Sequence, residues 1–516
     1  MLLADVVATS AAIAATRSRK AKVAAIADLL ARAGADELDT VTAYVGGALR
    51  QRRTGLGWRG LVGLPPPAGT PTLTVLEVHE AFDRIAALAG AGSQSARGAA
   101  VEQLFGRATG EEQQWLRGVV TGEVRQGALD SLVQEGLAAA AGVPLAEVRR
   151  AAMLAGSTVA IAAAAFEGSE ALGRVGLHVG RPVLPMLASS AADLAAALAK
   201  AGGGAPVAVD TKLDGIRIQV HRSGSDVLVA TRSLEDITAR LPEVVEVARS
   251  LPASSFVLDG EALALTEDGR PRPFQETASR TAMGAAPSDG QSAVTPYFFD
   301  VLHLDGADLL DAPAAERAAA LERLVPAGHR VPRVVTGDLG VAEEFLAEAL
   351  RSGHEGVVVK GLAAPYDAGR RGASWVKVKP VHTLDLVVLA VEWGSGRRRG
   401  WLSNIHLGAR DPASGADSEE RFVMLGKTFK GLSDETLRWQ TERFLELETH
   451  RDGHIVYVQP EQVVEIAFDG VQRSSRYPGG VALRFARVLR YRDDKLPQDA
   501  DTVVSVQAFL PQSGTQ

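Results

Sequence analysis

The segment VAVDTKLDGIRIQVHR, residues 207–222, contains the pattern on which the fold depends. Apolar and polar residues alternate on both sides of Asp214 and Gly215, as in two short strands joined by a turn. Lys212 follows the first strand, and the alternation directs Arg217 away from the buried face of the second. Both cations can therefore face one cleft. On its own, however, K-x-D-G is a weak signal that also suits an ordinary surface turn.

Three further β-rich segments carry charged residues. In FVLDGEALAL, Asp259 and Glu261 are two residues apart and share one face of a strand, a pattern that suits an oxygen-ligated Mg²⁺. Each strand alone is more typical of a half-exposed sheet edge, but the charged residues of all these strands together suit the binding of a polyphosphate with its metal. The segments HEGVVVKG and WVKVKP supply Glu355, Lys360, Lys377 and Lys379.

The length of 516 residues exceeds what one hydrophobic core usually organises, so several domains are expected. Residues 1–175 are rich in Ala, Leu, Glu and Arg with apolar spacings of three and four, which predicts an all-helical domain. Prolines and glycines predict a linker at 176–190. Alternating strands and helices predict an α/β domain over 191–380, and strand-rich 381–510 predicts a small β-barrel such as an OB-fold. The tail at 511–516 is expected to be disordered.

Composition excludes several classes of protein. The chain has no cysteine, which rules out a disulfide framework, a thiolate zinc site and a cysteine nucleophile. The N-terminus has no basic residue before its apolar run, and no stretch approaches the length of a membrane span, so we expect a cytoplasmic protein. A net charge of -7 gives no overall basic footprint, so any nucleic-acid-binding face would be local.

The order of these segments resembles the motif series of covalent nucleotidyltransferases. Within that superfamily the chain is similar to ATP-dependent DNA ligases over nearly its whole length. It is most similar to three-domain bacterial ligases with eukaryotic replicative architecture, such as actinobacterial ligase B. The segment at 121–140, TGEVRQGALDSLVQEGLAAA, is similar to a ligase DNA-binding domain. The matching motifs are K-x-D-G-x-R at 212–217, Arg232, D-G-E at 259–261, Phe299, E-G-V-V-V-K at 355–360 and W-V-K-V-K at 375–379.

The resemblance implies that ATP is the co-substrate and that AMP is carried on Lys212. Asp210 would face the adenine amino group, although the family usually has glutamate there. Phe299 would stack on adenine, unless it is only a core aromatic. Glu261 and Glu355 would bind Mg²⁺, or Mn²⁺. The ribose and phosphates would be held by Arg217, Arg232, Arg371, Lys377 and Lys379.

Two assignments have alternatives. Asp259 is either structural or catalytic. Arg492 and Lys495 lie in the R-D-D-K segment that matches the last ligase motif, more than a hundred residues beyond the catalytic domain. The resemblance implies that they close over ATP in the first step, after a domain motion. The other interpretation of R-D-D-K is an exposed charged turn.

The resemblance makes nicked duplex DNA the partner, with a monomer whose three domains encircle it. Because a ligase accepts any sequence, its contacts should be mainly with phosphates. The candidate segments are residues 51–53, 121–125 and 397–399.

Three rival interpretations remain. The helical N-terminal region argues against an RNA ligase or a capping enzyme. An NAD-dependent ligase fits poorly, since that family uses a cysteine zinc finger. A catalytically inactive DNA-binding relative is the third.

Overall fold

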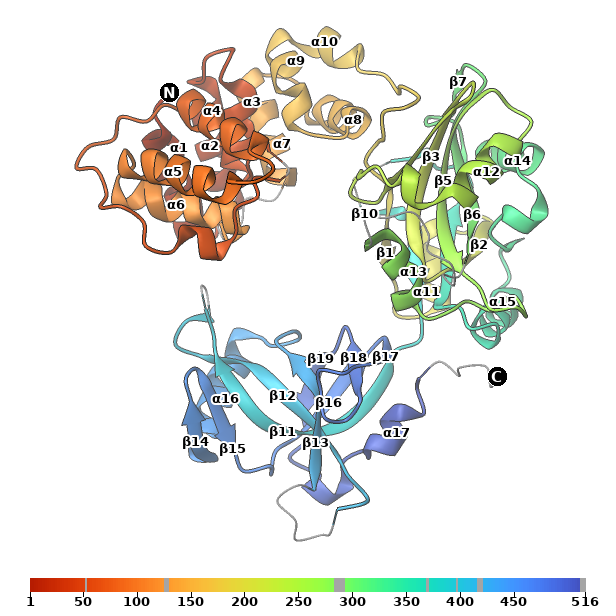
Figure 1. The fold of residues 1–516 in the computed structure, drawn as a ribbon. Helices are drawn as coiled ribbons and strands as arrows, with labels where there is room; N and C mark the ends of the chain where they lie inside the picture. The colour runs from red at the N-terminus through yellow and green to blue at the C-terminus, as the bar shows by residue number, and fades with distance from the viewer. Residues whose placement is uncertain are drawn as a thin grey trace.

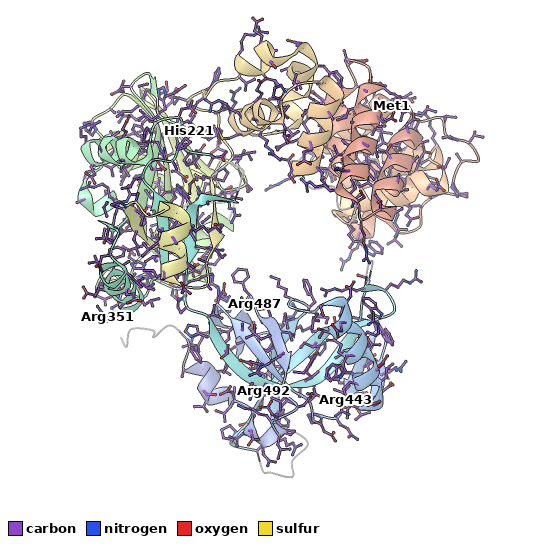
Figure 2. The ribbon with its side chains drawn as sticks, turned by 180° about the vertical axis from the view of Figure 1, so that it is seen from behind. Met1, His221, Arg351, Arg443, Arg487 and Arg492 are labelled. Carbon is purple, nitrogen blue, oxygen red and sulfur yellow. The ribbon has the colours of Figure 1, made fainter. Side chains whose placement is uncertain are left out.

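The computed structural model describes residues 1–51, 53–124, 130–282, 293–367, 371–395, 398–414 and 421–510; the side chains of residues 280–282 and 371 are also outside the description. Three domains follow one another along the chain, coloured red to yellow, yellow-green to cyan, and blue (Figure 1). Seen from behind, they lie around an open centre (Figure 2).

Helices make up the described part of the N-terminal domain. Two begin with reciprocal caps: the Thr74 hydroxyl accepts the Glu77 N–H while the Glu77 carboxylate accepts the Thr74 N–H, and Thr109 and Glu112 do the same. The helices are α1 Leu3–Ala15, α2 Arg19–Ala31, α3 Leu38–Val45, α4 Val75–Ala87, α5 Ser93–Gly106, α6 Gly110–Thr121, α7 Asp130–Ala141, α8 Leu145–Ala155, α9 Ala162–Glu167 and α10 Ser169–Gly173, with 3₁₀ helices at Trp58–Leu61 and Val159–Ile161.

These helices share a continuous apolar core in which Leu3, Phe82 and Phe105 are fully buried. Helices α2 and α7 approach so closely that a Cβ on Gly136 would lie 2.3 Å from Cγ2 of Ile26. No single helix in the described ranges is long and apolar enough to cross a membrane; α8 and the following helical segment pass that test only as a pair bent by 116°.

Two five-stranded sheets form the middle domain, and they divide the predicted active-site strands between them. The first has the order β1-β10-β9-β2-β8, and the second has the order β4-β3-β5-β6-β7. The first contains β1 Leu187–Ser190, β2 Val207–Lys212, β8 Arg333–Thr336, β9 Gly356–Gly361 and β10 Arg371–Val378. The second contains β3 Ile216–Ser223, β4 Asp226–Thr231, β5 Ser255–Ala264, β6 Val294–Leu304 and β7 Ala307–Asp308. Residues 187–190, which the sequence assigns to the linker, are therefore part of a sheet.

Helices cover both sheets. Helices α11 (Leu194–Gly202) and α15 (Leu339–Arg351) pack on valines of the first sheet, and α12 (Pro242–Ser250) and α14 (Ala314–Leu324) pack on the second. Helix α13, Phe274–Ala282, follows β5, and 3₁₀ helices lie at Thr238–Arg240 and Ala327–His329.

A separate apolar cluster joins the two sheets to the N-terminal domain. It contains Val257 and Leu302 of the second sheet, Trp375 of the first, and Met153 and Leu154 of α8. The first two domains therefore share a buried contact.

The C-terminal domain is built on a seven-stranded sheet with the path β13-β12-β11-β15-β14, in which β16 pairs with β11 and β19. The pairings of the described strands do not close it into a barrel, so the predicted barrel is not confirmed. Strand β11 pairs with β16 through its first half and with β15 through its second, so the sheet forks there. The strands are β11 His382–Trp393, β12 Leu402–Arg410, β13 Phe422–Thr428, β14 Glu448–Asp452, β15 Ile455–Val458, β16 Val463–Phe468 and β19 Arg487–Tyr491, with the hairpin β17 Gly470–Arg473 and β18 Val481–Arg484, helices α16 Asp434–Glu446 and α17 Val503–Gln507, and a 3₁₀ helix at Pro497–Asp499.

The close contact of α2 with α7 gives a first prediction. Gly136→Ala should destabilise the N-terminal domain by about 1–3 kcal/mol, because its Cβ would overlap Ile26 in a packed core. Gly98→Ala in α5 is the matched control: its Cβ would meet nothing within 4 Å, and it should stabilise α5 by about 0.5–1 kcal/mol. Amide hydrogen exchange in α2 and α7 measures the difference. Equal protection in the two variants would contradict the packing argument.

Candidate active site

The turn at residues 213–215 carries the chain from β2 in the first sheet to β3 in the second. A Cβ on Gly215 would lie 2.4 Å from the carbonyl oxygen of Ala262, so glycine is needed where the turn approaches β5. Gly356 has φ +142°, and a Cβ there would lie 2.3 Å from the Val378 carbonyl oxygen. Lys212 pairs in register with Gly356, so the K-x-D-G and E-G-V-V-V-K motifs meet at this lysine.

Lys212 ends β2 with its side chain 22% exposed. Its ammonium contacts a carboxylate oxygen of Glu355. The Glu355 carboxylate also lies 3.7 Å from Nζ of Lys379 and 3.8 Å from a guanidinium nitrogen of Arg484. Three cations thus share one carboxylate, and the structure brings together predicted residues from three separate motifs.

Glu261 extends from β5 toward the same place. Its Oε1 accepts the N–H of Gly215 at 3.2 Å. Burial raises the pKa of Glu261 to about 7, against the opposing effect of Lys212 and Arg217. A bound divalent cation would favour the ionised form.

Glu261 and Glu355 are the carboxylates near Lys212 that could hold Mg²⁺. In the part of the chain that the structure describes, no group of three or more acidic or histidine side chains forms a ready metal site. A cation here would take its other ligands from ATP and water, as Mg²⁺ commonly does.

Arg217 is fixed by Asp259. Its Nε and Nη2 donate to the two carboxylate oxygens at 3.0 and 2.6 Å, and Nη1 donates to the Met186 carbonyl at 2.6 Å. The Tyr366 hydroxyl donates to Asp259 at 2.6 Å. Asp259 is fully buried and binds Arg217 and Tyr366. Burial alone would lower the pKa of Arg217, but Asp259 raises it above its usual range.

Phe298 and Phe299 point to opposite faces of β6, as strand alternation predicts. Phe298 is fully buried, whereas Phe299 is only partly buried and makes an edge contact with Trp375, with ring centroids 5.8 Å apart. This geometry leaves Phe299 as the ring of the pair that could meet a ligand.

Asp210, which the resemblance places near the adenine amino group, is buried and is bound by two cations in the structure. It is 2% exposed, and its carboxylate accepts from Arg333 at 2.8 Å and from Lys360 at 2.7 Å. Two cations therefore already occupy the carboxylate that was expected to face adenine.

The other residues predicted to hold the ribose and phosphates are Arg232, Lys377 and Arg371. Arg232 is exposed after β4 and lines a small hollow with Arg217 and Asp259. Lys377 lies on β10, in register with Val358 of β9. Arg371 begins β10, but its side chain lies outside the described residues. These assignments stay predictions.

Arg484, at the end of β18, reaches from the C-terminal domain to the K-x-D-G turn. Its guanidinium donates to both carboxylate oxygens of Asp214, at 2.5 and 3.2 Å. Lys379 of the middle domain pairs with Asp469 of the C-terminal domain at 2.6 Å. These two ion pairs hold the C-terminal domain beside Lys212.

Phe485 follows Arg484 and is 56% exposed, with a left-handed backbone at φ +56°. The ammonium groups of Lys379 and Lys430 lie 5.7 and 5.4 Å from its ring centroid. An exposed aromatic ring with cations around it therefore lies at the junction of the two domains.

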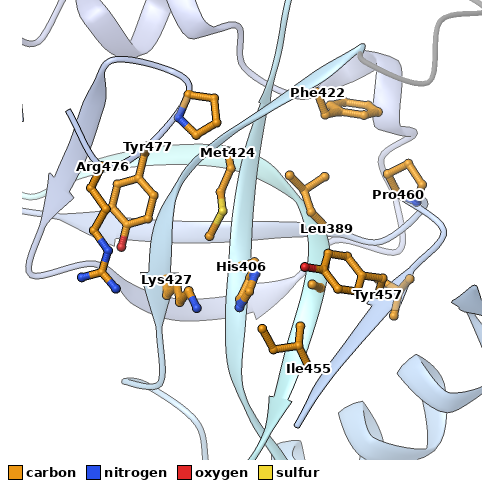
Figure 3. A pocket seen from close by; sticks show the side chains of 13 residues that line it. Leu389, His406, Phe422, Met424, Lys427, Ile455, Tyr457, Pro460, Arg476 and Tyr477 are labelled. Atoms are coloured by element: carbon orange, nitrogen blue, oxygen red, sulfur yellow. The ribbon is translucent and has the colours of Figure 1, made fainter. Parts of the chain in front are cut away.

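A hollow of about 540 Å³ lies on the C-terminal sheet, with a largely apolar lining that also contains aromatic and cationic side chains. Figure 3 shows Arg476 and Tyr477 on one side, Tyr457 on the other, and Lys427 and His406 between them. Aromatic and cationic side chains combined on one surface suit a nucleic acid.

The structure does not bring Arg492 and Lys495 together with Lys212. Lys495 Nζ lies 2.5 Å from Asp385, and Arg492 pairs with Asp385 at 3.3 Å and with Asp494 at 2.7 Å. All these partners belong to the C-terminal domain. In Figure 2, Arg492 lies deeper in that domain than Arg487, which is near the edge that faces the open centre.

Of the predicted DNA-binding segments, Arg52, Arg125 and Arg397 lie outside the described residues. Gln51 is engaged within its own domain, by His79 and Asp83. Arg53 is 84% exposed and lies 3.5 Å from Glu235 of the middle domain. The guanidinium of Arg398 donates to the carbonyl of Phe429.

Sequence reasoning missed Arg333, Arg484 and Asp469. Arg333 begins the short strand β8, which has no recognisable motif, and its partner Asp210 is 123 residues away. Arg484 lies in the ligase-like segment LRFARVLRYRDDK, yet no spacing rule pairs it with Asp214. Only the strand register and the placement of the domains reveal these contacts.

Comparison with known proteins identifies the family of this chain. The model of the ATP dependent DNA ligase domain matches residues 185–379, that of the ATP dependent DNA ligase C terminal region matches 398–495, and that of the DNA ligase N terminus matches 64–138. A protein named "Probable DNA ligase" from a Nocardioides species is 84% identical over 99% of this chain and 99% of its own. Another of that name, from Kineococcus radiotolerans, is 67% identical over 99% of this chain and 100% of its own. The chain belongs to the ATP-dependent DNA ligase family.

The solved structure titled "Pmar-Lig_PreS3" has the same fold, with a TM-score of 0.62 at 16% identity over 94% of this chain and 99% of that one. The sequence prediction of a three-domain, ATP-dependent DNA ligase is therefore confirmed: a helical region, a nucleotidyltransferase domain and a C-terminal sheet domain. The enzyme uses ATP and joins DNA.

The ion pairs between the second and third domains give a prediction about shape. Asp469→Ala combined with Arg484→Ala should shift the enzyme toward separated domains several-fold, because each ion pair is worth up to about 1 kcal/mol. Small-angle X-ray scattering should then report a larger radius of gyration than for the control Arg451→Ala, which removes an exposed cation of β14. An unchanged radius would mean that other contacts hold the C-terminal domain.

Proposed function

We propose that the enzyme seals nicks bearing a 3′-hydroxyl and a 5′-phosphate in duplex DNA, in replication, repair or recombination, through AMP carried on Lys212. The observation that supports this most directly is the position of Lys212 between Glu261 and Glu355, where the two sheets meet. Its Nζ attacks the α-phosphorus of ATP, so that a P–N bond forms and the bond to pyrophosphate breaks. AMP then passes to the 5′-phosphate of the nick, and the 3′-hydroxyl displaces it to form the phosphodiester.

The attack needs Lys212 as a neutral amine, because an ammonium has no lone pair to donate. Glu355 contacts the ammonium and can accept its proton directly. Lys379 shares the Glu355 carboxylate and would bind a phosphate of ATP beside Lys212.

Glu261 and Glu355 would hold Mg²⁺ or Mn²⁺, both of which prefer oxygen ligands. A bound cation would neutralise charge on the departing pyrophosphate. Adenine would stack on Phe299 near Asp210. The ribose and phosphates would be held by Arg217, Arg232, Arg371, Lys377 and Lys379.

Duplex DNA would lie in the open centre, encircled by the three domains of a monomer (Figure 2). The C-terminal sheet would be an OB-fold whose aromatic and cationic hollow faces DNA (Figure 3). Phe485 and the cations around it would contact the duplex beside Lys212. Such contacts with phosphates and sugars suit an enzyme that acts at any sequence, in the cytoplasm where bacterial DNA lies.

Lys212→Arg tests the proposed nucleophile. Arginine keeps the positive charge but does not lose its proton in proteins, so label from ATP should disappear from the denatured protein. The matched control is Lys200→Arg at the exposed end of α11, which should label normally. A phosphoramidate-linked AMP in Lys212→Arg would contradict the assignment, and absence of label in the unmodified enzyme would favour an inactive DNA-binding relative.

Lys495→Ala tests the role of the last motif. In the proposed role, Arg492 and Lys495 leave Asp385 and close over ATP only in the first step. Lys495→Ala should then slow formation of the Lys212 adduct by about tenfold or more. The same variant should seal a pre-adenylated nick at a near-normal rate. Arg451→Ala again serves as the control. Equal loss in both assays would mean that the motif supports folding or DNA binding, and no loss would favour an exposed charged turn.

A further inference from the structure

Arg333 joins two strands that the proposed ATP site uses. On β8 it pairs in register with Asp210 of β2. Its Nε donates to one carboxylate oxygen of Asp210, and its Nη2 donates to the other at 2.8 Å. The same Nη2 lies 3.2 Å from the carbonyl oxygen of Phe299 on β6. One guanidinium therefore bridges the first sheet to the second.

Lys360 repeats these contacts from β9. Its Nζ lies 2.7 Å from Asp210 and 3.5 Å from the carbonyl oxygen of Phe299. It also lies 4.5 Å from the centroid of the Phe299 ring. Both cations thus contact the same two acceptors, the Asp210 carboxylate and the Phe299 carbonyl oxygen.

This group of four residues is largely buried: the side chains of Asp210, Lys360 and Arg333 are 3%, 5% and 18% exposed. Burial alone would raise the pKa of Asp210, but Lys360 and Arg333 lower it below its usual range. Asp210 therefore stays an ionised group that can only accept hydrogen bonds. A carboxylate has about four acceptor positions, and the bonds from Arg333 and Lys360 occupy three.

We propose that Arg333 is a positioning residue that sets nucleobase selectivity, by fixing the Asp210 carboxylate relative to the ring of Phe299. This inference rests on the proposed roles of Asp210 and Phe299 in ATP binding. A base stacked on Phe299 would lie beside the Asp210 carboxylate, which is held in one orientation and can accept about one more hydrogen bond. Adenine offers an amino group at the ring position where guanine has a carbonyl oxygen. A carboxylate fixed at this position accepts a hydrogen bond from the amino group of adenine and repels the carbonyl oxygen of guanine.

Arg333 fixes the orientation of the Asp210 carboxylate because its planar fork holds both oxygens at once, which an ammonium does not do. Arg333 itself does not touch the base and acts through Asp210 and Phe299.

The test is Arg333→Met, with Arg323→Met on the exposed surface of α14 as the matched control. Single-turnover formation of the Lys212 adduct is measured against ATP and GTP concentration, together with sealing of a pre-adenylated nick. We expect the preference for ATP over GTP to fall about tenfold or more and the apparent KM for ATP to rise about tenfold, since the acceptor is no longer fixed. Sealing of the pre-adenylated nick should stay within about twofold, because that reaction needs no free ATP.

Arg333→Lys keeps the positive charge but lacks the planar fork, so this variant should lose part of the preference for ATP over GTP. If the Met variant does not fold, the Lys variant provides the test. A wild-type ATP preference in a folded Met or Lys variant would overturn the proposal, even if KM or stability changed. The proposed function fails by a different result, namely Lys212→Arg retaining the AMP adduct.

Discussion

Lys212 and Glu355 touch because β2 and β9 pair in the register that places Lys212 opposite Gly356. The rest of the site depends on that contact. The turn that follows Lys212 crosses to the second sheet, and Gly215 lets it pass against β5, where Glu261 accepts its N–H. The two carboxylates that could hold a cation thus come from different sheets and meet at one lysine. Two glycines make this close approach possible, and a side chain at either would separate the strands.

Charge compensation explains how so many ionised groups lie close together. Asp259 binds Arg217, Asp210 binds Arg333 and Lys360, and Glu355 is shared by three cations. A partly buried charge is tolerated when it is paired and hydrogen-bonded. Two of the three cations around Glu355 also pair with other carboxylates, Arg484 with Asp214 and Lys379 with Asp469, so charges of both signs lie close together around Lys212.

The two domain junctions differ in kind. The N-terminal domain meets the middle domain partly through a buried apolar cluster that includes Met153 and Leu154. The middle and C-terminal domains meet through ion pairs, from Arg484 to Asp214 and from Lys379 to Asp469, and through cation–π contacts such as that of Lys379 with Phe485. Ion pairs are weaker than buried apolar area and can exchange partners. This difference suits a C-terminal domain that moves between steps while the first two domains stay together.

The sequence by itself determined the family, the order of the domains and some of the charged residues beside Lys212, such as Glu355 and Lys379, because these follow from motifs and from periodicity along the chain. The resemblance named Phe299, and the structure places the neighbouring Phe298 in the core instead. Tertiary structure alone decided which charges pair. Asp210 is bound by Arg333, 123 residues away, and Asp214 by Arg484, 270 residues away, since strand register and domain placement set these contacts and leave no local pattern. The sequence also could not predict how the strands of the C-terminal sheet pair. Period-two alternation determines which face of a strand is buried, but it does not determine which strands pair at the edges of the sheet.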